Sequence, residues 1–142
     1  MSRLAVALAV AVLASTGAAQ AGYQSLYSFS GGTDGAHPSG GPIFGAHGTL
    51  YGVTSDGGTA GDCTGHDVHC GIVYRLDRDG TETVLHTFTG ENGDHPIGEL
   101  VRDAQGNLYG VTTNDVCRGG SCGTVFKLEP DAILVIHDES DL

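Results

Sequence analysis

Residues 50–54 read LYGVT, and residues 108–112 repeat the same five letters. The dipeptide His-Pro at residues 37–38 returns at residues 95–96, separated by the same offset as the two boxes. Motifs that recur together at one spacing indicate an internal repeat, and each copy of a repeat folds as the same supersecondary unit. Most of the chain is therefore expected to consist of two copies of one unit.

A further pair of segments shows what kind of unit this is. Residues 71–76 read GIVYRL and residues 123–128 read GTVFKL, and apolar and polar side chains alternate in both. Alternation with a period of two is typical of a strand with one buried face. In the second copy we predict strands near residues 97–102, 107–112, 123–128 and 133–137, with turns at 103–106 and near 129–131.

Four short antiparallel strands in about 50 to 60 residues are typical of a β-propeller blade. We therefore predict an all-β, β-propeller-like fold of about two four-stranded antiparallel blades, with copy one at about residues 37–88 and copy two at about 95–137. Residues 23–29 match the last strand of copy one but precede it, which predicts an N-terminal lone strand. That strand either closes a propeller or is the remnant of a truncated extra copy.

Two blades are too few for a closed propeller, which takes about four to eight. The chain is then a shortened repeat protein, one part of an oligomeric ring, or an open stack of sheets. Because sheet faces and edges are left without a neighbouring blade, we expect the chain either to self-associate or to be only loosely folded.

The first 21 residues predict export. Arg3 precedes a run of Ala, Val and Leu at residues 4–14, and Ala-Gln-Ala follows at 19–21. A charged start, a short apolar middle and a small-residue exit are typical of a secretory signal peptide, and the run falls short of the about 20 residues that span a bilayer. We expect cleavage after residue 21, a β-repeat domain at 22–142 without a transmembrane segment, and a secreted, periplasmic or cell-surface location.

Acidic residues dominate the composition. The chain has 17 Asp and Glu against 6 Lys and Arg, a formal net charge of −11. Nucleic acids and anionic membranes select basic patches, so neither is expected as a partner. The sequence indicates no cofactor.

Three boxes together resemble the GloVer tandem-repeat proteins, which are exported bacterial proteins that often carry a C-terminal anchoring segment. The matching boxes are residues 106–112, 123–128 and 85–88, with first-copy versions at 48–54, 71–76 and 26–29. The resemblance implies a secreted or surface-attached, β-propeller-like protein of unknown activity, and it transfers no catalytic residue. Relatives usually have many more copies, and the pattern decays here beyond residue 128.

Four cysteines in an exported chain favour two disulfides. Cys63 and Cys70 bracket a loop in copy one, and Cys117 and Cys122 bracket the equivalent loop in copy two. Pairing within each loop is the economical assignment. The alternative is a metal site, because Cys63, His66, His69 and Cys70 together offer the thiols and imidazoles that zinc binds. Adjacent residues 69 and 70 point apart in extended chain, and copy two has no histidine in its loop, so the disulfide is favoured.

Two pairs of equivalent residues are candidate binding positions. His37 and His95 each precede a proline, and their repetition favours a structural job such as bonding a turn carbonyl. Tyr51 and Tyr109 lie in the identical box and are either aromatic rim residues for a ligand or, as we favour, packing residues between blades.

No cluster unique to one copy points to catalysis. Residues 119–123 satisfy the G-x-S-x-G string of serine hydrolases around Ser121, but that string works on a strand-to-helix elbow and here leads into a strand. We therefore expect a secreted or cell-envelope β-repeat module that binds an extracellular protein or glycan or has a structural role. The alternative is an extracellular hydrolase or lyase on a propeller-type scaffold.

Overall fold

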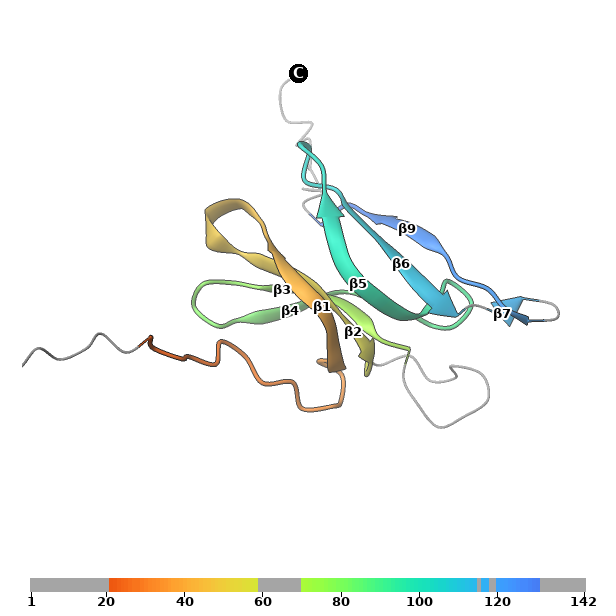
Figure 1. Ribbon diagram of the computed structural model, residues 1–142, viewed down its shortest axis with the longest axis horizontal. Helices are drawn as coiled ribbons and strands as arrows, with labels where there is room; N and C mark the ends of the chain where they lie inside the picture. The colour runs from red at the N-terminus through yellow and green to blue at the C-terminus, as the bar shows by residue number, and fades with distance from the viewer. Residues whose placement is uncertain (1–20, 59–69, 115, 118–119, 131–142) are drawn as a thin grey trace, which may run out of the picture.

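The computed structural model describes residues 21–58, 70–114, 116–117 and 120–130. Within them the chain forms two antiparallel sheets that lie against each other (Figure 1). Sheet one has the order β1 (Ala36–Phe44), β2 (Leu50–Asp56), β3 (Ile72–Leu76) and β4 (Glu82–Thr87). Sheet two has the order β5 (Asp94–Arg102), β6 (Leu108–Asn114) and β9 (Val125–Leu128). A 3₁₀ turn (Ala46–Gly48) joins β1 to β2, and β7 (Val116–Cys117) pairs with β8 (Gly120–Ser121) in a small hairpin.

The two sheets repeat each other in register. The β1–β2 ladder shifts between Ser39 and Ile43, and the β5–β6 ladder shifts between Ile97 and Val101, which are the equivalent positions of the two copies. Such a bulge bends a strand and increases its twist. Both sheets are therefore curved at the same place, which lets one nest against the other.

The glycine of the repeated box makes room for an aromatic ring on the next strand. Gly52 lies opposite Tyr74, and Gly110 lies opposite Phe126. A Cβ at either glycine would overlap the ring of its partner. The box therefore requires glycine at this position because the ring of β3 or β9 crosses directly over the backbone.

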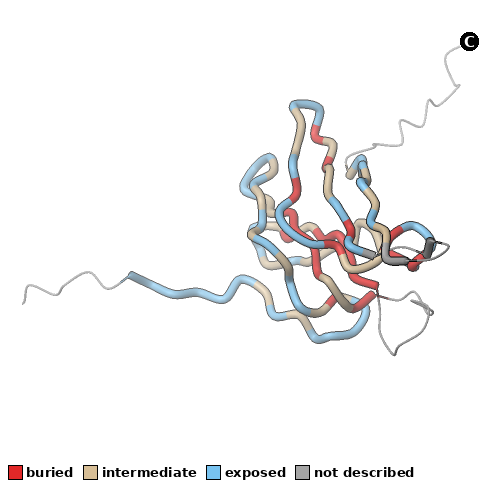
Figure 2. Tube along the Cα trace, turned by 45° about the vertical axis from the view of Figure 1, so that its right-hand side comes forward, coloured by how far each residue is buried: buried red, intermediate tan, exposed pale blue. Residues whose placement is uncertain are grey.

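The main core lies between the sheets, where the buried residues gather in the middle of the molecule (Figure 2). Sheet one and the segments next to its strands contribute Tyr51, Val53, Cys70, Val73 and Phe88, and sheet two contributes Leu100 and Leu108. The ring of Phe88 stands edge-on to that of Phe126, with the two ring centroids 5.2 Å apart. This separation lies within the range of about 4.5 to 7 Å that is usual for aromatic pairs. The segment that links the two copies therefore contributes Phe88 to the hydrophobic core.

The predicted lone strand at residues 23–29 is wrong, because residues 21–30 form no strand and join no sheet. Tyr27 and Phe29 instead pack on the outer face of sheet one, where the ring of Phe29 lies 5.0 Å from that of Tyr74. A lone strand needs the edge of a last blade to pair with, and the two sheets do not form a ring that would bring such an edge to this segment.

The predicted two-copy, all-β architecture is confirmed, with four strands in the first sheet and three in the second. The expected turn at 103–106 is present and is closed by a bond from the Gly106 N–H to the Asp103 carbonyl. The fourth strand predicted near 133–137 lies outside the described residues. The sheets do not close into a propeller in the described part of the chain, which likewise contains no helix long and apolar enough to cross a membrane.

Candidate functional site

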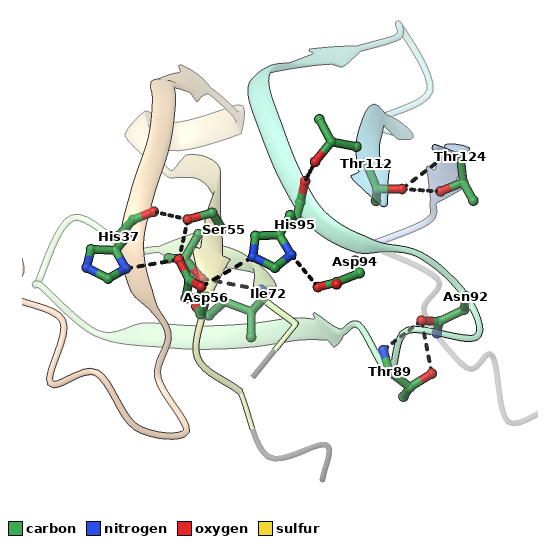
Figure 3. A network of polar contacts seen from close by, with 12 residues as sticks. His37, Ser55, Asp56, Ile72, Thr89, Asn92, Asp94, His95, Thr112 and Thr124 are labelled. Carbon is green, nitrogen blue, oxygen red and sulfur yellow. Dashed lines mark hydrogen bonds and ion pairs between the residues drawn. The ribbon is translucent and has the colours of Figure 1, made fainter. Parts of the chain in front are cut away.

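A polar cluster joins the two sheets at the start of β1 and β5 (Figure 3). Its histidines, His37 and His95, both have φ of 52°, in the left-handed region that few residues other than glycine adopt. Histidine is among the residues enriched there, and the prolines that follow restrict the histidines further. Both copies therefore hold the histidine in the same uncommon backbone conformation.

Hydroxyl groups from the neighbouring strand brace these two backbones identically. Ser55 Oγ donates to the carbonyl oxygen of His37 at 3.3 Å, and Thr113 Oγ1 donates to that of His95 at 3.1 Å. Ser55 and Thr113 are themselves equivalent residues, each following the repeated box. The same side-chain-to-backbone bond thus occurs twice, once in each sheet.

The two imidazole rings converge on one carboxylate, that of Asp56 at the end of β2. His37 Nδ1 lies 2.9 Å from Asp56 Oδ2, and His95 Nε2 reaches across from sheet two to within 3.6 Å of Asp56 Oδ1. The backbone N–H of His95 also donates to the carbonyl oxygen of Cys70 at 3.2 Å. Asp56 therefore connects the sheets through His95, and the main chain reinforces the connection.

Asp94 lies on the other side of the His95 ring. Its Oδ1 is 2.7 Å from His95 Nδ1, a charge contact by distance, yet neither of these buried atoms has a hydrogen bond of proper geometry within the described residues. We regard this contact as electrostatic attraction between adjacent residues. It adds negative charge beside the imidazole without fixing its orientation.

The surroundings of Asp56 favour its ionised form. Burial acts to raise the pKa of Asp56, but hydrogen bonds from Ser55 and His37 and the charges of His95 and His37 outweigh it, so the pKa is lowered. Ser55 Oγ is 2.6 Å from Asp56 Oδ2. The carboxylate is therefore an acceptor for several donors at once and remains charged at neutral pH.

The arrangement differs from a hydrolase triad. A triad needs the nucleophilic hydroxyl bonded to an imidazole nitrogen, whereas the Ser55 hydroxyl reaches Asp56 and the His37 carbonyl oxygen. Ser121 lies in strand β8, so its G-x-S-x-G string has no strand-to-helix elbow in the described chain. Among the described residues, no three His, Cys, Asp or Glu side chains are placed so that together they could hold a metal ion.

The structure places the other candidate residues in different settings. Tyr51 is 3% exposed and belongs to the core between the sheets, which makes it a packing residue. Tyr109 is half-buried and its hydroxyl donates to Asp103 Oδ2 at 3.0 Å, which ties β6 to the preceding turn. Equivalent positions in the two copies therefore have different environments.

The cysteine assignments remain predictions. Cys63, His66 and His69 lie outside the described residues, and so does the side chain of Cys117. Cys70 is fully buried, and no cysteine in the described part of the chain is free. Neither the pairing within each loop nor the alternative metal site is tested by these residues.

Sequence reasoning named the two histidines but missed the carboxylates between them. Asp56 follows the repeated box by two positions, and antiparallel pairing of β1 with β2 places it opposite Ala36, next to His37. An acidic residue two positions after the box was the available signal, and it occurs only in copy one, because Asn114 stands at the equivalent position in copy two.

Comparison with known proteins agrees with the repeat pattern. A family model described as the Gloeobacter/Verrucomicrobia repeat matches residues 12–140, nearly the whole chain. No curated protein matches the sequence.

Proposed function

This chain belongs to the Gloeobacter/Verrucomicrobia (GloVer) repeat family, and we propose that it is an exported, non-catalytic β-repeat module with a binding or structural role outside the cytoplasm. The single observation that carries this proposal is that the cluster of titratable side chains links the two sheets. Asp56, His37 and His95 join one repeat to the next, and the hydroxyl beside them braces a backbone carbonyl.

The duplication of the braced histidine backbone supports the same conclusion. A catalytic centre needs groups held within about 1 Å of one productive arrangement, and such a centre is unique in its chain. Here the braced histidine occurs in both copies with the same φ and the same hydroxyl partner type. Features that appear once per repeat serve the architecture of the repeat.

Export is part of the proposal and rests on the N-terminal sequence. Arg3, the apolar run at 4–14 and the Ala-Gln-Ala exit at 19–21 predict removal of residues 1–21. Intact-mass measurement of the protein recovered outside the cytoplasm should give a chain that begins at Gly22. A secreted chain that still begins at Met1 would overturn this part of the proposal.

The rival function is an extracellular hydrolase or lyase that uses His95 as a base beside Asp94 and Asp56. A screen with ester, glycoside and polyuronate substrates on wild type and on Asp56→Asn tests it directly. We expect no turnover by either protein. Turnover by wild type that Asp56→Asn abolishes, while circular dichroism shows an unchanged β signal, would replace the binding module by an enzyme.

A further inference from the structure

The open face of sheet two is made of the same positions that form the inner face of sheet one. Val53 and Val73 are 2% and 0% exposed because sheet two covers them, whereas their equivalents Val111 and Val125 are 42% and 82% exposed. Ile43 packs against the core between the sheets, and its equivalent Val101 is exposed. The open face of sheet two therefore consists of the equivalents of the residues through which sheet one contacts sheet two.

The opposite side of the molecule shows the reciprocal difference. Pro96 of β5 is fully buried against Gly71 of the other repeat, while its equivalent Pro38 of β1 is exposed. Leu100 is buried between the sheets, and Pro42 at the equivalent position is exposed. Within the chain, sheet two contacts sheet one through its β5 side. The equivalent β1 side of sheet one is exposed.

A backbone contact at the junction shows how closely these surfaces fit. A Cβ on Gly40 would overlap the backbone carbonyl of Gly98, because the bulges of β1 and β5 touch there. Gly98 is the equivalent of Gly40, and a Cβ on Gly98 would meet nothing within 4 Å. Sheet two thus keeps the small residue required for a close neighbour at a place where the described residues supply none.

The N-terminal segment completes the repeated surface. Tyr27 bonds Asp34 and stacks edge-on against Phe29, just as His86 contacts Asn92 and stacks against Phe88. Phe88 is 1% exposed because it lies between two sheets, but Phe29 is covered on one side by Tyr74 and is only half-buried. Phe29 therefore has an open side at the position where Phe88 has a second sheet.

From these four observations we propose that the open face of sheet two binds the β1 side of sheet one in a second copy of this chain. The contact is head-to-tail and repeats the junction within the chain, with Gly98 of one copy against Gly40 of the next. Head-to-tail contacts close into rings or continue as filaments. A closed propeller has about four to eight blades, so a ring of about two to four chains is expected. This inference deepens the structural role proposed above.

Sedimentation velocity of the exported chain over a dilution series tests the proposal. Wild type should sediment as an assembly that dissociates on dilution. Raised ionic strength should strengthen it by screening the repulsion between acidic chains, because the full sequence has a formal net charge of −11 and the exported chain also lacks Arg3. Val125→Glu places a charge among the exposed apolar residues of the face, and Gly98→Asn fills the contact point with a residue that tolerates positive φ. Each should weaken self-association by about tenfold or more.

Gln105→Glu is the matched control, because it adds the same charge at an exposed turn away from the face and should leave association unchanged. Far-UV circular dichroism of each variant verifies that the sheets remain folded. A wild type that stays monomeric at every concentration would overturn the proposal and point to residues 131–142 or another protein as the cover. Association that persists equally in both variants would also overturn it. Neither result depends on the substrate screen, so failure of this inference and failure of the non-catalytic role are separate outcomes.

Discussion

Sheets one and two have matching boxes, matching bulges and matching braced histidines, yet their equivalent residues are buried to very different extents. Val73 is inaccessible in sheet one, and Val125 is almost fully exposed in sheet two. The difference comes from position in the series, because sheet one has a neighbour on the face that sheet two leaves open. A residue of the repeat therefore stabilises this fold only where the next repeat is present to cover it.

The largest expected difference in stability between the two regions is at the phenylalanines that end residues 26–29 and 85–88. Phe88→Ala removes a buried ring from between the sheets and should lower the free energy of unfolding by about 3 to 5 kcal/mol. Phe29→Ala removes a half-buried ring from the outer face and should cost roughly 1 kcal/mol. Urea denaturation of both variants at a concentration where the chain is monomeric measures the two values. Equal losses would show that the N-terminal segment is a full part of the core.

The bulge glycines should give the next largest contrast. Gly40→Asn forces a side chain into the backbone of Gly98, and such overpacking should cost about 2 to 3 kcal/mol. Gly98→Asn has the same φ requirement but open space, so its cost should stay below about 1 kcal/mol. Thermal melts of the pair check the prediction. The shared conformational penalty cancels in the comparison, and a Gly98→Asn melt as low as that of Gly40→Asn would contradict it.

The paired valines test the burial difference most directly. Val73→Ala deletes two methyl groups from the core and should destabilise the chain by about 1.5 kcal/mol. Val125→Ala deletes the same groups from an exposed surface and should change stability by less than about 0.5 kcal/mol. Denaturant midpoints at low and high protein concentration distinguish folding from association. A concentration-dependent loss in Val125→Ala would place that valine in an interface.

The smallest effect is expected at Asp56, whose equivalent in copy two is Asn114. Because the folded pKa of Asp56 lies below its ordinary value of 3.8, its contribution is present above that value and is lost as the pH falls through the lowered pKa. Asp56→Asn removes this dependence, so wild type should lose more stability than the variant between about pH 5 and about pH 3. The difference should be below about 1 kcal/mol, as for other accessible ion pairs. Parallel pH–stability curves would show that the carboxylate does not join the sheets.

Particular residues show where prediction from the sequence succeeded and failed. The identical boxes at 50–54 and 108–112 predicted equivalent strands, and β2 and β6 confirm them, since period-two alternation is a local property of the backbone. Residues 23–29 carry the same local signal as β4 but form no strand, because a strand needs a partner edge that lies far along the chain or in another molecule. His37 and His95 were found through their repetition, whereas the Asp56 contact with His95 depends on how one sheet lies against the other.

The amino-acid sequence by itself determined the repeat, the all-β class and most strand positions, because these follow from spacing, alternation and backbone propensity within one unit. Only the tertiary structure decided which copy of each residue is buried. Tyr51 lies in the core and Tyr109 does not, although their boxes are identical, because burial depends on the neighbouring sheet and no local pattern records whether that neighbour exists. The open face of sheet two was therefore invisible in the repeat itself and appears only when the two copies are compared in space.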